Sequence, residues 1–360
     1  MMQYGMTIFF ALAIGLSCLR LRKKKEEEGI LDKASTTALK GILCIFIMLH
    51  NLGLDFQGNS WLSETISDRA GTVAVSMFFF LSGYGLLKAY QAKGNKFLLK
   101  LILHNCVKLY LIAVGINLLE YLVFFRGAFD TKDTILRILN LDLFNNFNRM
   151  NRHGWFIASI LAMYVIFALV FFIFSLFKLK HNVLVATLIV AAVSLGFYLT
   201  TLIVGQGGMY TKGLPCFGVG LLYTYFYTYV NKFLARFRIP IEIVTLAISI
   251  VDILLFWGTI AGYLMNFFVI ALSTKYRYDN RVSLFLGKIS LGVYLFLHFS
   301  TLTLAAQVEN VYFWVLTNAG LIMLLATMLY GVVYAIEWGI KKIIESRNRP
   351  KEIEQQKNSA

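Results

Sequence analysis

Long apolar stretches recur along the whole chain and alternate with short segments that carry most of the charged residues. Each stretch comes close to, or exceeds, the roughly 20 apolar residues with which an α-helix crosses the hydrocarbon core of a bilayer. The stretch from Ile239 to Thr274 is too long for one ordinary crossing, yet it contains no polar loop. If this stretch is counted as two helices, the pattern predicts eleven spans. They lie near residues 4–19, 38–54, 71–87, 98–124, 154–177, 183–204, 213–230, 240–256, 258–274, 284–304 and 311–340.

The positions of the basic residues favour two helices in that stretch and set the orientation of the chain. Cytoplasmic loops of membrane proteins carry an excess of Lys and Arg. With two helices, 27 of the 34 Lys and Arg residues fall in segments on one side of the membrane and seven fall on the other. With one helix, the later basic segments would change sides. We therefore predict an N-terminus outside and a C-terminus in the cytoplasm.

The composition is that of an integral membrane protein. Of 360 residues, 58% are hydrophobic and only three are proline, and the mean hydropathy is +0.69. We expect an N-terminal span and basic cytoplasmic loop over 1–34, one membrane domain over 35–343, and a disordered cytoplasmic tail over 344–360. The outer segment 126–153 fits either a short amphipathic element or a plain loop. The net charge of +15 fits this orientation and an anionic lipid surface better than nucleic-acid binding.

Three polar side chains are predicted at one depth in the membrane. His50 follows Lys40 by ten residues, and His298 follows Lys288 by the same interval. Ten residues of helix rise about 15 Å, which is near the middle of a bilayer. Ser82, in the sequence MFFFLSGYGLLK, reaches a comparable depth in a span of opposite direction. A cavity is one interpretation. For Ser82 and the glycines after it, a close contact between helices is the other.

A neutral imidazole at that depth is suited to general base catalysis, because histidine has an ordinary pKa of about 6.5 and can accept a proton from a hydroxyl. Asp252, also deep in a span, fits either structural pairing or a functional role, and His104 with Lys108 forms a basic rim at the cytoplasmic side. The chain has no nucleophile elbow, no acid/base carboxylate pair and no His/Cys cluster at metal spacing. Hydrolases and metalloenzymes therefore have little support, and no metal is expected.

Five segments resemble, in order, the acyltransferase-3 family of multispan membrane O-acyltransferases. They are LKGILCIFIMLHN, AVSMFFFLSGYGLLK, HGWFIASILAMYVIF, KGLPCFGVGLLYTYF and LGKISLGVYLFLH, and the resemblance runs from residue 38 to about 304. The FFFLSGYG sequence is the most specific of these signals. The resemblance implies an all-α polytopic bundle of about ten core transmembrane helices, to which the N-terminal span is an addition. It also implies transfer of an acyl group, usually acetyl from cytoplasmic acetyl-CoA, to a hydroxyl of a cell-envelope or exported glycan.

The chain departs from the family pattern at two places. The family's basic residue and essential histidine correspond to Lys40 and His50, but their usual spacing is eleven residues. A spacing of ten displaces His50 by about 80° around the helix and leaves Asn51 in phase with Lys40. The family's arginine pair corresponds to Asn105 and Lys108, so a single positive charge remains for a phosphate of CoA.

These correspondences predict a site between the cytoplasm and the outer surface. The residues expected to contact acetyl-CoA as acyl donor are Lys40, Lys100 and Lys108. Those expected to be catalytic are His50, as general base, and Ser82. A glycan or glycolipid acceptor arrives from outside, and the residues expected to contact it are His153, Trp155 and His298.

The rival hypothesis is a glycan exporter or proton-coupled transporter of the same fold, which moves its substrate without acyl transfer. In that case Asp252, His50 and His298 form a proton relay. Both hypotheses predict a multi-pass protein of the cell membrane that is surrounded by lipid and has no nucleic-acid partner. The sequence leaves the oligomeric state and the identity of the glycan open.

Overall fold

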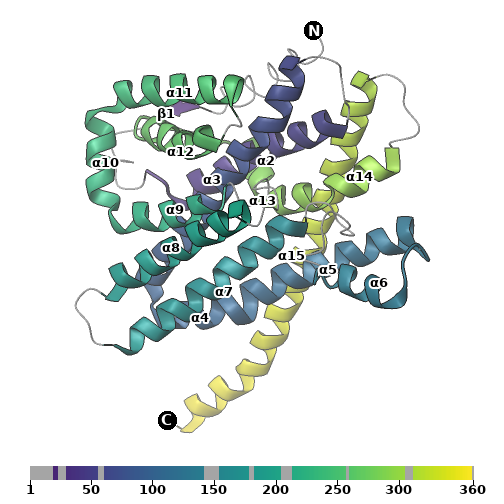
Figure 1. Cartoon of the computed structure of the whole chain (residues 1–360). Helices are drawn as coiled ribbons and strands as arrows, with labels where there is room; N and C mark the ends of the chain where they lie inside the picture. Colours follow the sequence, from purple (N-terminus) through teal and green to yellow (C-terminus); the bar gives the residue numbers. More distant parts are fainter. Residues whose placement is uncertain are drawn as a thin grey trace.

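The computed structural model describes residues 19–22, 30–55, 61–141, 154–177, 182–203, 213–256, 259–304 and 311–358. The predicted span at 4–19 lies outside these ranges except for its last residue. The described chain is almost entirely helical, which confirms the predicted all-α fold (Figure 1). In chain order the elements are β1 (Arg20–Leu21), α2 (Lys33–Asp55), α3 (Trp61–Lys93), α4 (Asn95–Lys100), the π-helix η2 (Leu101–Cys106), α5 (Val107–Glu120), the π-helix η3 (Tyr121–Phe125), α6 (Thr131–Ile138), α7 (Gly154–Leu176), α8 (Asn182–Ile203), α9 (Pro215–Tyr225), α10 (Tyr227–Arg236), α11 (Arg238–Leu255), α12 (Thr259–Ser273), β2 (Tyr276–Arg277), α13 (Arg281–Leu295), α14 (Leu297–Leu304) and α15 (Val311–Asn358).

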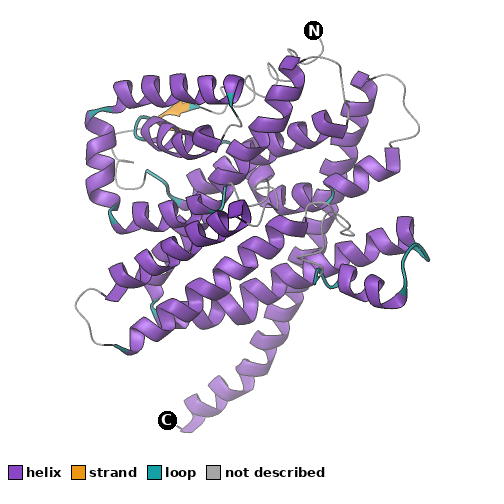
Figure 2. Cartoon of the chain, in the orientation of Figure 1, coloured by secondary structure: helices purple, strands orange, loops and turns teal. Residues whose placement is uncertain are grey.

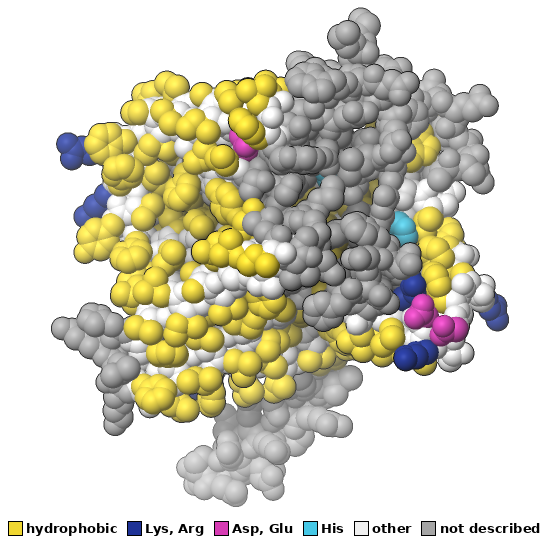
Figure 3. Space-filling model, viewed as in Figure 1, with side chains coloured by type: hydrophobic (Ala, Val, Ile, Leu, Met, Phe, Trp, Pro, Cys, Tyr) yellow, Lys and Arg dark blue, Asp and Glu magenta, His cyan; other side chains and the backbone are white. Residues whose placement is uncertain are grey.

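The structure contains helices that fit a bilayer. In the described chain, six are long and apolar enough to cross it: Lys33–Leu52, Gly71–Lys93, Asn95–Phe125, Gly154–Leu176, Asn182–Thr201 and Phe313–Lys342. The bent pair α13 and α14 gives a seventh if it forms one crossing. Hydrophobic side chains cover most of the described surface seen in Figure 3, and charged ones gather near α10 at one edge and α6 at the other. This distribution fits a protein whose middle is surrounded by lipid.

The prediction of about ten core spans is not established, because several predicted spans are shorter or broken. The stretch 213–230 divides into α9 and α10 at Phe226, and 284–304 divides into α13 and α14 at Phe296, with a bend of 60° at the second break. At both residues the backbone leaves the α-helical region (φ −94°, ψ 19° and φ −89°, ψ 3°). Figure 1 shows α10 running across the neighbouring ends of α9 and α11.

The long apolar stretch at 239–274, predicted from the charge pattern to cross the membrane twice, forms two helices, neither of which is among the six candidate spans of the described chain. α11 and α12 pack against each other (Figure 2). Asp252 of α11 is buried, and its Oδ2 accepts a hydrogen bond of 2.7 Å from the backbone N–H of Ala261, in the first turn of α12. The first N–H groups of a helix have no partner within it, so this carboxylate supplies one. Asp252 therefore has the structural pairing that the sequence left open.

Glycines allow two pairs of helices to pack backbone to backbone. A Cβ added to Gly83 of α3 would overlap the carbonyl oxygen of Phe217 in α9, and one on Gly220 of α9 would overlap α3. Gly41 of α2 and Gly287 of α13 make the same kind of contact. The small residues of the FFFLSGYG sequence thus include a true helix contact at Gly83. Gly85 has open space around it and makes none.

The ends of the helices on the side predicted to be cytoplasmic are joined by hydrogen bonds and ion pairs. β1 pairs with β2 in an antiparallel sheet, and the Arg277 guanidinium forms ion pairs with Asp32 at 2.9 Å and Asp279 at 2.7 Å. Burial alone would raise the pKa of the Asp279 carboxyl, but its hydrogen bond to Arg277 and the nearby charge of Arg20 hold that pKa below its usual value. The segment before α2 is thereby fixed to the loop before α13.

Two segments outside the core bundle differ in how they match the predictions. Within 126–153, α6 is a short helix with Asp130 as its N-cap. The Asp130 side chain accepts a hydrogen bond of 2.8 Å from the backbone N–H of Asp133. Asn117 of α5 donates to carbonyls at the end of α6, so this helix lies against the outer part of α5. The segment 344–360, expected to be disordered, is helical up to Asn358 as the end of α15. It is rich in Glu, Lys, Arg and Gln, which are good helix formers.

Candidate functional site

A cavity of about 230 Å³ lies between five helices of the bundle. Its lining is mostly apolar and aromatic, and its polar atoms come from a few side chains. The lining residues are Lys40, Cys44 and Ile47 of α2, Phe78 and Ser82 of α3, Leu109 of α5, Phe156, Ile157, Ile160 and Tyr164 of α7, and Ser290, Leu291 and Tyr294 of α13. Such a pocket, apolar with a few convergent polar groups, is the usual form of a small-molecule site.

Lys40 is the charged residue of this lining. Lys40, Cys44 and Ile47 follow one another at spacings of four and three residues, so one face of α2 forms this wall. In the described part of the chain, no acidic side chain forms an ion pair with Lys40. A buried ammonium without a counter-ion is costly in free energy. The cavity is therefore suited to a ligand, or a reaction step, that brings negative charge to Lys40.

A pair of hydroxyl groups lines the same cavity. The side chains of Ser82 in α3 and Tyr164 in α7 share a hydrogen bond. Ser82 was predicted from the sequence, whereas Tyr164 was not, because nothing in the apolar run of α7 distinguishes it from a core aromatic. Because the two hydroxyls share one hydrogen bond, one O–H of the pair and the Lys40 ammonium remain as donors toward the apolar cavity.

The imidazole of His50 lies beside the cavity rather than in its lining. The ring contacts Gly71 of α3, where an added Cβ would overlap it. Asn51, the next residue in phase with Lys40 and Ile47, donates a hydrogen bond of 2.8 Å to the carbonyl of Ile47. The structure thus brings Lys40 and Ser82 together and places His50 on the neighbouring face of α2, as the ten-residue spacing predicts.

The other predicted donor contacts lie on a second surface. Lys100 ends α4, and His104 of η2 and Lys108 of α5 follow it at intervals of four residues. The three side chains surround Glu337 of α15. The Lys108 Nζ lies 2.7 Å from Glu337 Oε1, and both side chains are partly exposed. Two of the three predicted donor residues are therefore grouped on this surface and are separated from Lys40.

The predicted acceptor contacts are placed as follows. Trp155 is half-buried in the first turn of α7, next to Phe156, which lines the cavity. His153 lies outside the described residues. His298 lies on α14 just after the 60° bend, and its Nδ1 is 3.2 Å from Oε2 of Glu120. Glu120 was missed by the sequence analysis, although it is the one acidic residue within the predicted span 98–124.

The helices that build this cavity belong to a known type of membrane protein. A family model described as an acyltransferase domain matches residues 33–337. The chain belongs to the acyltransferase-3 family. The match covers every helix that lines the cavity, and it confirms the resemblance seen in the sequence. No curated protein and no solved structure matches the chain.

Membership of the acyltransferase-3 family has direct chemical consequences. The protein is a membrane acyltransferase, and the reaction of an acyltransferase needs an acyl donor and an acceptor. Among the described residues, no three His, Cys, Asp or Glu side chains are grouped so that they could hold a metal ion. The polar groups of the cavity lining are the Lys40 ammonium, the Cys44 thiol, and the hydroxyls of Ser82, Tyr164, Ser290 and Tyr294.

Proposed function

We propose that this acyltransferase-3 protein moves an acetyl group from cytoplasmic acetyl-CoA to a hydroxyl of a cell-envelope or exported glycan, and that it works in the cell membrane. The observation that carries the proposal is the Lys40 ammonium, which faces an apolar cavity beside the Ser82 and Tyr164 hydroxyls. Acyl transfer from a thioester passes through a tetrahedral oxyanion, and this set of donors is suited to bind one.

The transfer forms a carbon–oxygen ester bond and breaks the carbon–sulfur bond of the thioester. The acceptor hydroxyl gives up its proton to a base, and CoA leaves as a thiol after it takes a proton. Lys40 and the Ser82–Tyr164 pair stabilise the negative charge that develops on the acyl oxygen between these events. The apolar lining of the cavity excludes water, which would otherwise hydrolyse the thioester.

In this proposal His50 is the general base. It lies three residues beyond Ile47 on α2, and its ring packs on Gly71 at the side of α2 that faces α3. The acceptor hydroxyl therefore meets the imidazole on the α2–α3 side of the cavity. The glycan arrives past Trp155, because that residue is next to Phe156 at the end of the cavity predicted to face outward.

The donor arrives from the predicted cytoplasmic side. Lys100 and Lys108 bind phosphates of CoA at the surface, while the thioester end reaches Lys40. Because Lys108 is paired with Glu337 at 2.7 Å, a phosphate has to compete with this carboxylate. The pair is partly exposed, so this competition costs little free energy.

The transporter hypothesis has less support. It needs Asp252 in a proton relay with His50 and His298. The Asp252 carboxylate instead accepts a hydrogen bond from the N–H of Ala261 and so connects the end of α11 to the first turn of α12. The family match also favours acyl transfer over transport. Purified protein that consumes no acetyl-CoA thioester while it moves glycan across a membrane would favour the transporter.

The test is acetylation of envelope glycans in cells that carry either wild-type protein or H50A as their only copy. Alkali-labile acetate on the isolated glycan is measured, and the amount of protein in the membrane fraction is determined for each variant. We expect H50A to reach the membrane at the wild-type level and to acetylate no glycan. Unchanged acetylation by H50A would overturn the assignment of the base, and a wild-type protein that adds no acetate would overturn the proposed reaction.

A further inference from the structure

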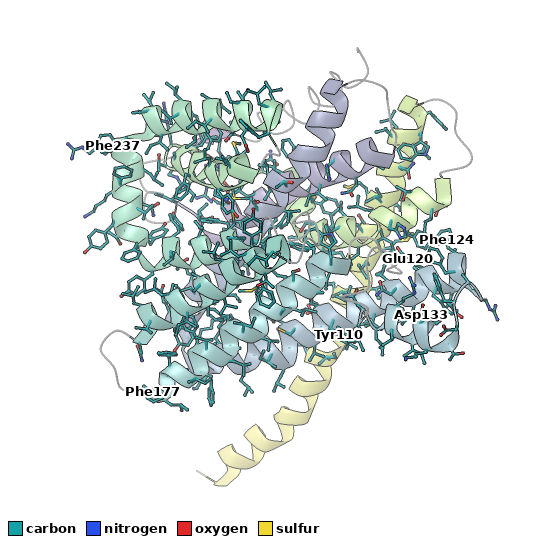
Figure 4. All side chains as sticks on the ribbon, viewed as in Figure 1. Tyr110, Glu120, Phe124, Asp133, Phe177 and Phe237 are labelled. Carbon is teal, nitrogen blue, oxygen red and sulfur yellow. The ribbon has the colours of Figure 1, made fainter. Side chains whose placement is uncertain are left out.

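A carboxylate and an imidazole are paired inside the bundle, away from the cavity lining. The Glu120 side chain has 0% of its surface exposed and the His298 side chain 12%, and Oε2 of Glu120 lies 3.2 Å from Nδ1 of His298. Figure 4 labels Glu120 at the end of α5 beside α14, while Asp133 lies farther out on α6. Ionisable groups at membrane depth are costly and are kept where they serve a site.

Both residues of the pair stand where a helix loses its regular form. Glu120 is the last residue of α5, and the π-helix η3 begins at Tyr121. His298 is the second residue of α14, after the 60° bend at Phe296. π-helical turns and broken membrane helices are frequent at functional sites, because they turn side chains out of the regular helix face. Here the two irregularities bring together residues that are 178 positions apart.

The orientation of the His298 ring is fixed from two directions. The Phe125 ring of η3 stacks on it with centroids 6.4 Å apart and an angle of 11° between the planes. When Glu120 is ionised, its carboxylate accepts a hydrogen bond from Nδ1–H, and the basic lone pair of the neutral ring is then on Nε2. A carboxylate that orients a histidine in this way commonly controls its tautomer and its basicity.

The pair lies on the side of the cavity from which the acceptor is expected. Tyr294 of α13 lines the cavity, and His298 follows it by four residues toward the predicted outer surface. α2 and α13 are packed side by side, with Gly41 of α2 against Gly287 of α13. His50 and His298 follow these two glycines by nine and eleven residues, and α14, which carries His298 beyond the 60° bend, contacts α2.

We propose that the Glu120–His298 pair is the acceptor-binding site, in which Glu120 is a positioning residue and His298 accepts a hydrogen bond from a hydroxyl of the acceptor. The inference rests on the proposed function and deepens it. It assigns the acceptor to the class of polyhydroxylated molecules, because one hydroxyl binds His298 while a second one, near His50, is acylated.

The test separates acceptor binding from donor chemistry in the full-length protein in lipid nanodiscs. Envelope from cells that lack the protein serves as acceptor, radiolabelled acetyl-CoA is the donor, and the concentration of each is varied. Removing a group that orients a histidine typically changes affinity or activity by about 10- to 100-fold. We expect E120Q to raise the KM for envelope by about 10- to 100-fold, with the KM for acetyl-CoA unchanged.

Three further variants sharpen this result. H298A should have the same effect as E120Q, and the double variant should add little to either, because the two residues act as one unit. E120D, which keeps the carboxylate, should restore part of the affinity. D133N removes a carboxylate from α6 at the same side of the protein and should behave as wild type. If E120Q does not accumulate in the membrane, H298A carries the test, and H298Q, whose amide oxygen can accept the same hydrogen bond, should keep part of the affinity.

A spectroscopic measurement tests the positioning role of Glu120 directly. The chain has five histidines, so the H298A variant assigns the His298 signals in a protein labelled with ¹⁵N at histidine. The neutral His298 ring should carry its proton on Nδ1 in the wild type, and E120A, which removes the acceptor, should change this distribution. An unchanged tautomer in E120A, losses that multiply in the double variant, or an unchanged KM for envelope in E120Q would overturn the inference. A wild-type protein without acetyl transfer would instead overturn the proposed function.

Discussion

The contact between α3 and α9 makes a quantitative prediction for two glycines that are two residues apart. A Cβ on Gly83 would overlap the Phe217 carbonyl oxygen and would lie 3.1 Å from its carbon and 3.2 Å from the Leu221 nitrogen. These are backbone atoms and cannot rotate away, so the two helices must separate by about 1 Å. Gly85, by contrast, has no atom within 4 Å of its added Cβ.

The cost of the G83A substitution follows from the dispersion energy that the two helices lose when they separate. A gap of about 0.5–1 Å removes a quarter to a half of the dispersion energy of each atom pair. On the order of 30 pairs at about 0.1–0.2 kcal/mol each then lose about 1–3 kcal/mol, which is the usual range for overpacking. At about 2–4 °C per kcal/mol, we expect G83A to unfold about 2–12 °C below wild type.

The matched variant is G85A, which should be neutral or slightly stabilising, because alanine is the better helix former. Thermal unfolding of both proteins in the same detergent, followed by intrinsic fluorescence and by size-exclusion chromatography, compares them directly. Equal melting temperatures, or a larger loss in G85A, would show that α3 and α9 do not meet at Gly83.

Three further predictions concern charged residues. K40M removes a charge from the apolar cavity, so it should unfold at or above the wild-type temperature. Its kcat for acetyl transfer should fall about 100-fold. A lower unfolding temperature with full activity would contradict the role of Lys40. E337Q removes the charge that is paired with Lys108 and should lower the KM for acetyl-CoA by about 2- to 5-fold at low salt, with a smaller effect at high salt. An increase in this KM would contradict the assignment of Lys108 to the donor site. Because its folded-state pKa is lowered, Asp279 adds stability above its ordinary pKa, and this is lost as pH falls through the folded value. Wild type should therefore melt above D279N at pH 6, and the difference should shrink toward pH 3; a constant difference would contradict the ion pair with Arg277.

Much of the fold follows from local patterns in the sequence. Apolar length predicts the long helices, and charge counting alone divides 239–274 into α11 and α12. The breaks at Phe226 and Phe296 are not visible in the same way, since neither position carries a proline or glycine and both residues are apolar. Such breaks are set by packing between helices, which a single sequence does not display.

Part of the candidate site, like part of the fold, could be predicted from local patterns in the sequence. Lys40 and Ser82 stand out as polar residues in apolar runs, and helical phase predicts that His50 lies off the face of Lys40. The partner of Ser82 is a tyrosine in another helix, and the partner of His298 is 178 residues away. Pairings over such distances depend on how the helices are arranged in space.

The length of α15 has a consequence beyond the membrane. Its 48 residues measure about 72 Å at 1.5 Å per residue, more than twice the thickness of the hydrocarbon core. The last sixteen residues, beyond the apolar segment that ends at Lys342, continue the helix for about 24 Å, with Pro350 removing one backbone hydrogen bond near the middle. A fluorophore attached at Asn358 would therefore stand off from the lipid surface at a defined height, so energy transfer to a labelled bilayer would measure that height directly.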